Sequence, residues 1–141
     1  MAVEMDVVYR GELACEVTHG PSGATITTDA PLDNGGRGAA FSPTDLVAAA
    51  LGSCLVTIMG LTANRDGLDI DGTRIHVTKE MAAAPMRRIS RLVATITLPH
   101  GKKPLSDAER TKLEASARLC PVKQSLHPDT EVVMEFVYPG E

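Results

Sequence analysis

A stretch of 19 residues without a charged side chain, from 46 to 64, constrains this chain more than any other feature. It follows Ser42-Pro43-Thr44-Asp45, in which serine is a favoured N-cap, proline suits the first helical position and an acid suits the first turn. The sequence therefore predicts a helix from Pro43 to about Asn64. Because this helix is apolar on nearly every face, we expect other elements to cover it in the middle of the fold.

The same stretch approaches the length of a membrane span, which needs about 20 apolar residues. Small and polar residues interrupt it, namely Gly52, Ser53, Thr57, Gly60, Thr62 and Asn64. Neither end carries a Trp or Tyr that would mark the membrane interface. We therefore expect a buried helix and no membrane partner.

Length and charge exclude several classes of protein. A chain of 141 residues fits one domain, 1–141. The formal net charge of -4 offers no basic surface to neutralise a phosphate backbone, so we expect no nucleic-acid partner. The first ten residues, MAVEMDVVYR, lack the basic start and apolar run of a secretory signal, which predicts a cytoplasmic protein.

Shorter patterns on both sides of the helix predict strands and further helices. Extended pieces between Val7 and Thr28 predict an antiparallel meander, and a glycine-rich loop carrying Arg37 follows at 30–40. The later elements are a hairpin at 73–81 and 88–98, a capping-box helix from Asp107 to about Leu119, a short helix at 122–126 and a closing strand at 131–138.

Three cysteines are the candidate reactive groups, and a reducing compartment disfavours explaining them as structural disulfides. Cys54 lies about three turns into the long helix, too far from its start for the helix dipole alone to activate it. Cys120 precedes Pro121, which can end one helix and begin another, so backbone N–H groups would favour a thiolate there. Either cysteine could instead be a packing residue, and Cys15, within a strand, is expected to be inert.

Two arginines are candidates to support a thiolate, Arg10 at a strand end and Arg37 in the glycine-rich loop. A guanidinium could hold a thiolate and also bind a peroxide oxygen, although a solvated surface role is the alternative for each. The four histidines are scattered, and no C-x-x-C or H-x₃-H spacing occurs. We therefore expect neither a metal site nor a cofactor.

Taken together, SPTDLVAAALGSCL at 42–55 and ARLCPVKQSL at 117–126, with the hairpin between them, resemble the OsmC/Ohr family. The resemblance implies an α+β fold in which antiparallel sheets wrap around long central helices in an intertwined homodimer. It also implies that Cys54 is the peroxidatic cysteine and Cys120 the resolving one, with Arg10 in VVYRGEL as the early-strand arginine that supports catalysis.

The activity that this resemblance implies is a thiol peroxidase. Cys54 would attack an organic hydroperoxide to give a sulfenic acid, a Cys54–Cys120 disulfide would follow, and an external dithiol would restore both thiols. Two other functions stay open on the same scaffold: a non-enzymatic binder of small apolar ligands, and a redox-sensing protein that uses the same disulfide.

One position departs from the Ohr pattern, in which a glutamate follows the proline that begins the helix and pairs with the arginine. Thr44 occupies that position here, and the nearest carboxylate is Asp45. One residue along a helix is a rotation of about 100°. The departure favours a divergent OsmC-like branch of the family.

Overall fold

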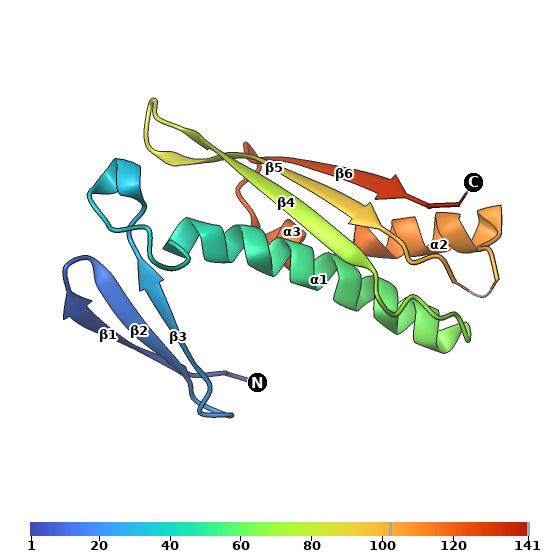
Figure 1. The fold of residues 1–141 in the computed structure, drawn as a ribbon, viewed down its shortest axis with the longest axis horizontal. Coiled ribbons are helices and arrows are strands. Elements are labelled where there is room, and N and C mark those ends of the chain that lie inside the picture. The colour runs from blue at the N-terminus through green and yellow to red at the C-terminus, as the bar shows by residue number, and fades with distance from the viewer. Residues whose placement is uncertain (102, 141) are drawn as a thin grey trace. The chain divides into compact units, whose positions relative to one another are not determined.

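The computed structural model describes residues 1–101 and 103–140. The chain forms two compact units, Met1–Val47 and Ala48–Glu141, and each contains its own three-stranded sheet (Figure 1). Their boundary falls inside the long helix α1, Pro43–Arg65. The bounds of α1 confirm the predicted helix, while the expectation of one domain over 1–141 stays a prediction.

The first unit is the predicted antiparallel meander. Its strands are β1 (Met5–Gly11), β2 (Ala14–His19) and β3 (Thr25–Asp29), paired in the order β1-β2-β3. A short 3-10 helix, η1 (Leu32–Asn34), lies in the glycine-rich loop that follows.

One face of this sheet is apolar and exposed. The strand register places Val17 between Val7 on β1 and Ile26 on β3. Two residues further along the same face, Tyr9 of β1 pairs with Cys15 of β2. Val7 and Tyr9 are both 63% exposed and Ile26 is 49% exposed. A contiguous apolar surface of this kind is typical of a surface that another element or chain covers.

The second unit contains a mixed sheet in the order β4-β5-β6. β4 (Arg74–Ala82) and β5 (Arg88–Thr97) form the predicted hairpin, and β6 is Glu131–Val137. The expectation of antiparallel sheets is wrong for β6, which pairs with β5 in parallel. The physical reason is the connection: α2 (Asp107–Ala117) and α3 (Pro121–Ser125) form the crossover that a parallel pair requires.

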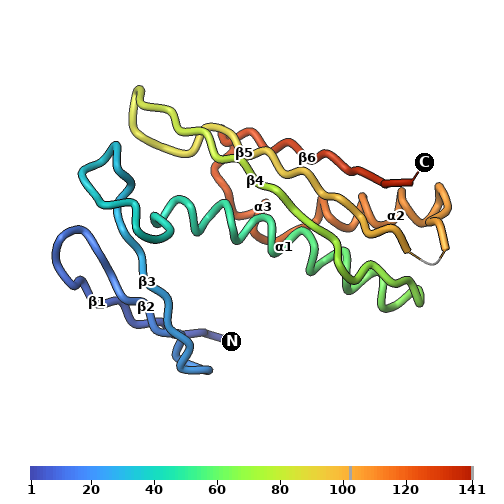
Figure 2. Tube along the Cα trace, in the orientation of Figure 1, coloured from blue at the N-terminus to red at the C-terminus, as the bar shows by residue number. Residues whose placement is uncertain are grey.

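The core of the second unit lies between this sheet and the helices along one of its faces. Figures 1 and 2 show α1 and α2 on the same side of β4, β5 and β6. The fully buried side chains come from three elements: Leu51, Leu55 and Met59 of α1, Leu92, Ala94 and Ile96 of β5, and Leu113 and Ala117 of α2. A mixed α+β core with one covered sheet face is the result.

Only one side of α1 is covered by the described part of the chain. Of its most apolar 18-residue window, 33% is buried, and Leu61 on the outer side is 49% exposed. The expectation that other elements surround this helix is therefore met on one side only. By length and composition alone α1 could cross a membrane, a test that core helices of soluble proteins also pass.

Two glycines of α1 give a matched test of this packing. A Cβ atom added at Gly52 would lie 2.9 Å from Val77 Cγ2 and 3.4 Å from Ile75 Cγ2, whereas one at Gly60 would meet no atom within 4 Å. We expect Gly52→Ala to lower the free energy of unfolding by about 1–3 kcal/mol through overpacking. Gly60→Ala should raise it by up to about 1 kcal/mol, because alanine favours the helix. Urea unfolding of both variants measures the difference, and equal shifts would contradict it.

Candidate thiol site

Cys54 lies in the middle of α1 on the border between the buried and exposed sides. Its neighbours Leu51 and Leu55 are fully buried, while Ser53 is exposed. Cys54 itself is half-buried and packs against the core of the second unit. The helix therefore holds this thiol at the edge of an apolar core and leaves part of it accessible.

Cys120 occupies the position that its sequence context predicts. α2 ends at Ala117, Cys120 is the N-cap of α3, and Pro121 is the first residue of that helix. The side chain is 0% exposed and belongs to the same core against which Cys54 packs. The structure thus brings together two cysteines that are 66 residues apart in the sequence.

The environment of Cys120 favours the neutral thiol. Burial raises its pKa above the ordinary value, and the neighbouring Cys54 thiol raises it further. The backbone N–H groups of Lys123 and Val122, in the first turn of α3, act in the opposite direction and lower it. Cys120 is therefore a protonated thiol next to Cys54, with donors in place that would stabilise a thiolate once one forms.

This difference in exposure predicts an order of alkylation. In a Cys15→Ser background, iodoacetamide at pH 8 should modify Cys54 at least about tenfold faster than Cys120, because the thiolate is the nucleophile and Cys120 is buried and protonated. Raising the pH should increase the rate at Cys120, as its thiolate fraction grows. Peptide mapping after timed quenching measures both rates, and faster labelling of Cys120 would contradict the assignment.

The two candidate arginines both form ion pairs within the first unit. Arg10 Nη2 lies 3.2 Å from Glu16 Oε1, and Arg37 Nη1 lies 3.5 Å from Glu12 Oε2. All four side chains are well exposed, so each pair contributes at most about 1 kcal/mol and could exchange for another partner. The support of Cys54 by either arginine stays a prediction.

Asp45 and Thr44 are part of the cap of α1. The Ser42 hydroxyl accepts a hydrogen bond from Asp45 N at 3.1 Å, and Asp45 Oδ2 accepts one from Ser42 N at 2.9 Å. This is the reciprocal arrangement of a capping box, with aspartate as the acid. Thr44 Oγ1 lies 3.2 Å from Ser42 Oγ. The Asp45 carboxylate therefore helps to begin the helix that carries Cys54.

Cys15 is not part of the Cys54–Cys120 pair. Cys15 lies in β2, in the first unit, and is a free thiol like the other two cysteines. Across residues 1–101 and 103–140, no group of three His, Cys, Asp or Glu side chains is arranged to hold a metal ion. The predicted backbone N–H groups beside Cys120 are those of Val122 and Lys123, and the Cys-Pro dipeptide was the sequence signal for this cap.

These features define a class of protein: an α+β chain with a pair of neighbouring free thiols, one buried and one accessible. The family model described as OsmC-like protein matches residues 35–135, a range that includes both cysteines. The chain belongs to the OsmC-like protein family. Among curated proteins, none matches the chain.

Solved structures agree with this assignment. A proposed osmotic stress induced and detoxification response protein from Psychrobacter arcticus is 42% identical, with a TM-score of 0.84 over 95% of this chain and 93% of that one. An organic hydroperoxide resistance protein OsmC from Legionella pneumophila is 18% identical, with a TM-score of 0.76 over 97% of each chain. The organic hydroperoxide resistance protein OhrB of Bacillus subtilis is 16% identical, with a TM-score of 0.68 over 96% of this chain and 98% of that one.

Proposed function

We propose that this protein is a thiol peroxidase that reduces organic hydroperoxides. The Cys54 thiolate attacks one oxygen of the O–O bond, which breaks to give a Cys54 sulfenic acid and an alkoxide that leaves as the alcohol after protonation. The Cys120 thiol then condenses with the sulfenic acid, forming a Cys54–Cys120 disulfide and releasing water. An external dithiol reduces this disulfide and is itself oxidised to a disulfide.

The observation that carries this proposal is the meeting of Cys54 and Cys120 at one apolar core. The accessible thiol can meet a peroxide, while the buried thiol can meet only a group that forms inside the protein. The apolar surroundings suit the organic part of a hydroperoxide better than they suit hydrogen peroxide. Membership of a family that includes organic hydroperoxide resistance proteins supports the same substrate class.

The environment of Cys120 fits the resolving role. Burial and the neighbouring Cys54 raise the pKa of Cys120, which keeps its thiol neutral in the reduced protein. The N–H groups at the start of α3 then stabilise the charge that develops on its sulfur during attack. The supporting cation is proposed to be Arg10, with Arg37 as the second candidate.

We also propose that the working form is a homodimer in a cytoplasmic, reducing compartment. The outer side of α1 is uncharged and exposes Ala49, Ala50, Ser53, Thr57 and Leu61, and the exposed face of the β1–β3 sheet is apolar. A second copy of the chain would remove these surfaces from water, which favours association by roughly 25 cal/mol for each Å² of apolar area buried. Such an assembly would enclose a pocket for the organic part of the substrate.

Thiol counting with intact-mass analysis tests the reaction directly. The reduced protein is mixed with one equivalent of cumene hydroperoxide and, in parallel, with one equivalent of hydrogen peroxide. We expect rapid loss of two thiols, mapped to a Cys54–Cys120 disulfide, and a slower reaction with hydrogen peroxide. Persistence of all three thiols would overturn the proposal and favour a non-enzymatic ligand-binding role.

Replacement of Cys120 distinguishes a peroxidase from a non-enzymatic ligand-binding protein and from a redox sensor. Cys120→Ser should still form a sulfenic acid at Cys54 in a single turnover, detected by dimedone adduct mass, but should lose at least about 90% of steady-state turnover with dithiothreitol because the disulfide cannot form. Cys15→Ser is the matched control and should retain full turnover. A simple binder would be indifferent to both substitutions, and a redox sensor would lose a partner interaction instead of a rate.

A further inference from the structure

The two sulfurs of the thiol pair differ in their access to solvent. Cys120 is 0% exposed, whereas Cys54 is half-buried at the edge of the same core. Leu119, the residue before Cys120, is 71% exposed, so the chain turns its leucine outward and its cysteine inward at this corner. A reagent that arrives from solvent therefore meets the sulfur of Cys54 and not that of Cys120.

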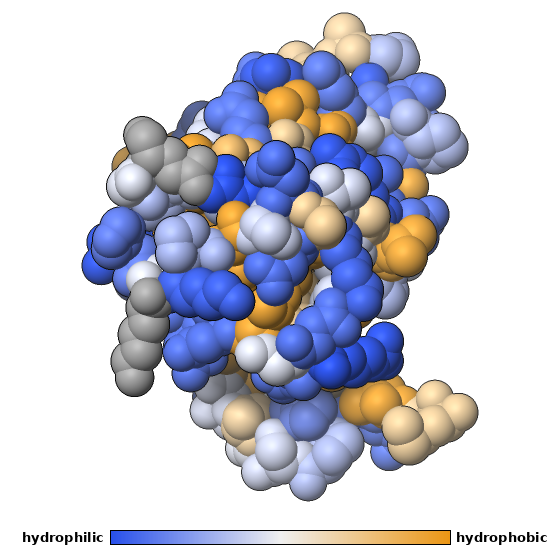
Figure 3. Space-filling model, turned by 90° about the vertical axis from the view of Figure 1, so that its right-hand side faces the viewer, coloured by the Kyte–Doolittle hydropathy of each residue, from blue (hydrophilic) through white to orange (hydrophobic). Residues whose placement is uncertain are grey.

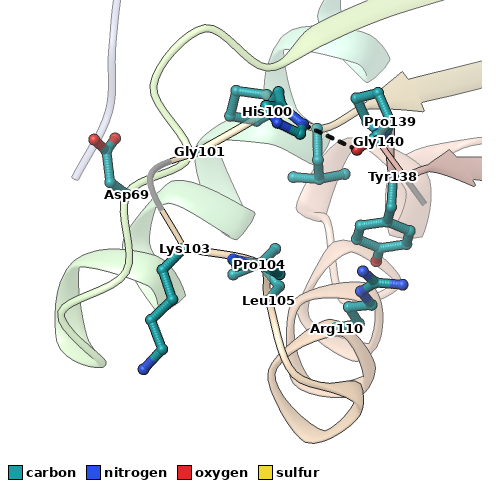
Figure 4. Close-up of a pocket in the computed structure, with 12 residues that line it drawn as sticks. Asp69, His100, Gly101, Lys103, Pro104, Leu105, Arg110, Tyr138, Pro139 and Gly140 are labelled. Atoms are coloured by element: carbon teal, nitrogen blue, oxygen red, sulfur yellow. Dashed lines mark hydrogen bonds between the residues drawn. The ribbon is translucent and has the colours of Figure 1, made fainter.

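Two cavities of about 210 Å³ each lie in the second unit, and both are separate from the thiols. Figure 4 shows the first, which is lined by the segment after β5, by Arg110 of α2 and by the residues after β6. Figure 3 views the molecule from that end, where hydrophobic atoms surface between hydrophilic ones. The second cavity adjoins Lys123 of α3 and Leu126. Among the described residues that line these cavities, neither Cys54 nor Cys120 occurs, so neither cavity provides a route to Cys120.

We propose that the external dithiol attacks the Cys54 sulfur of the oxidised pair and expels Cys120 as the leaving group. This step rests on the Cys54–Cys120 disulfide of the proposed function. The outcome of a thiol–disulfide exchange depends on which sulfur the attacking thiolate can reach, and here that sulfur belongs to Cys54. Hydroperoxide and dithiol therefore react with the same sulfur, in alternating half-reactions.

The bonds and electrons of the step balance as two exchanges. A thiolate of the dithiol bonds to the Cys54 sulfur, the bond to Cys120 breaks, and Cys120 leaves as a thiolate that takes a proton from water. The second thiol of the reductant then attacks the reductant's own sulfur in this mixed disulfide. The reductant leaves as a disulfide, the Cys54 thiolate is released, and two electrons have passed to the protein.

The surroundings of Cys120 act on the leaving group in two directions. Burial, and then the neighbouring Cys54, raise the pKa of Cys120, and a thiol of higher pKa leaves more slowly. The backbone N–H groups of Val122 and Lys123 lower that pKa and stabilise the departing thiolate. Access outweighs the raised pKa, because a sulfur without exposed surface cannot be attacked from solvent at any leaving-group pKa.

Trapping the mixed disulfide tests which sulfur is attacked. Full-length Cys15→Ser protein is oxidised with diamide, which forms the disulfide without a peroxide, and is then mixed with excess 2-mercaptoethanol. Acid and denaturant stop the exchange at early times, N-ethylmaleimide blocks the released thiol, and peptides are mapped by mass. We expect at least about tenfold more mercaptoethanol on Cys54 than on Cys120, with N-ethylmaleimide on Cys120. Equal labelling, a majority on Cys120, or failure of diamide to form the disulfide would overturn the inference.

The use of diamide keeps this result distinct from the peroxidase function. A protein whose disulfide forms with diamide and is attacked at Cys54, but whose thiols persist with cumene hydroperoxide, would lose the proposed peroxidase activity and keep the assigned point of attack. A protein that is oxidised by the hydroperoxide but carries mercaptoethanol on Cys120 would keep the activity and lose the assigned point of attack.

The lifetime of the adduct on Cys54 tests the role of Cys120 as the leaving group. Hydroxyethyl disulfide places mercaptoethanol on Cys54 of reduced protein in a Cys15→Ser background, with and without Cys120→Ser. A thiol held beside the mixed disulfide acts at a high effective concentration, so Cys120 should expel the mercaptoethanol and form the internal disulfide. We expect the adduct to last at least about a hundredfold longer in the Cys120→Ser protein. Equal lifetimes would show that Cys120 does not exchange with Cys54, which contradicts the proposed step.

Discussion

Serine in place of Cys54 is expected to slow the reduction of cumene hydroperoxide by at least about a thousandfold. A serine hydroxyl at neutral pH is a far weaker nucleophile than a thiolate, and removal of an enzyme nucleophile commonly costs three orders of magnitude or more. The substitution changes one atom in a half-buried side chain, so the fold should persist. Hydroperoxide consumption with dithiothreitol as the reductant measures the rate.

Two controls make this result specific to Cys54. Cys15→Ser changes the same atom in β2 of the first unit and should leave the rate within about twofold. Cys120→Ser should retain the first turnover, because the peroxide reacts with Cys54 before the disulfide forms. A Cys54→Ser protein that consumes hydroperoxide at the wild-type rate would transfer the peroxidatic role to another residue and would remove the basis for the proposed mechanism.

Leu55→Ala is expected to lower the free energy of unfolding by about 2–5 kcal/mol. Leu55 is 0% exposed, one residue after Cys54, and packs in the core formed by α1, β5 and α2. Truncation removes buried methyl groups and leaves a cavity that the surrounding layers fill only in part. The loss is a large fraction of the stability of a typical domain, and urea unfolding followed by circular dichroism measures it.

Leu61→Ala is the matched control, because it makes the same chemical change on the outer side of the same helix. Leu61 is 49% exposed, so we expect the unfolding of an isolated chain to change by less than about 1 kcal/mol. If a second copy covers this side of α1, the substitution should instead weaken self-association, which sedimentation velocity detects at dilute concentration. Wild-type protein that sediments as a monomer at all concentrations would contradict the proposed homodimer.

The sequence by itself determined the elements with strong local signals. Ser42 and Pro43 mark the start of α1, the uncharged run sets its length, and the predicted end at about Asn64 is one residue from the observed Arg65. The Ser106–Glu109 capping box gives the start of α2 in the same way. Caps and hydrophobic periodicity act between residues within a few positions of each other, so they can be read without knowledge of the fold.

Only the tertiary structure decided how these elements meet. The parallel pairing of β6 with β5 could not be read from alternation within β6, because a strand's periodicity is the same for either partner direction. The closeness of Cys54 to Cys120 depends on α1 and the α2–α3 corner sharing one core, and so does the pKa of Cys120, which is raised first by burial and then by the neighbouring Cys54 thiol. Contacts between residues far apart in sequence arise from packing across the whole unit, and no local pattern encodes them.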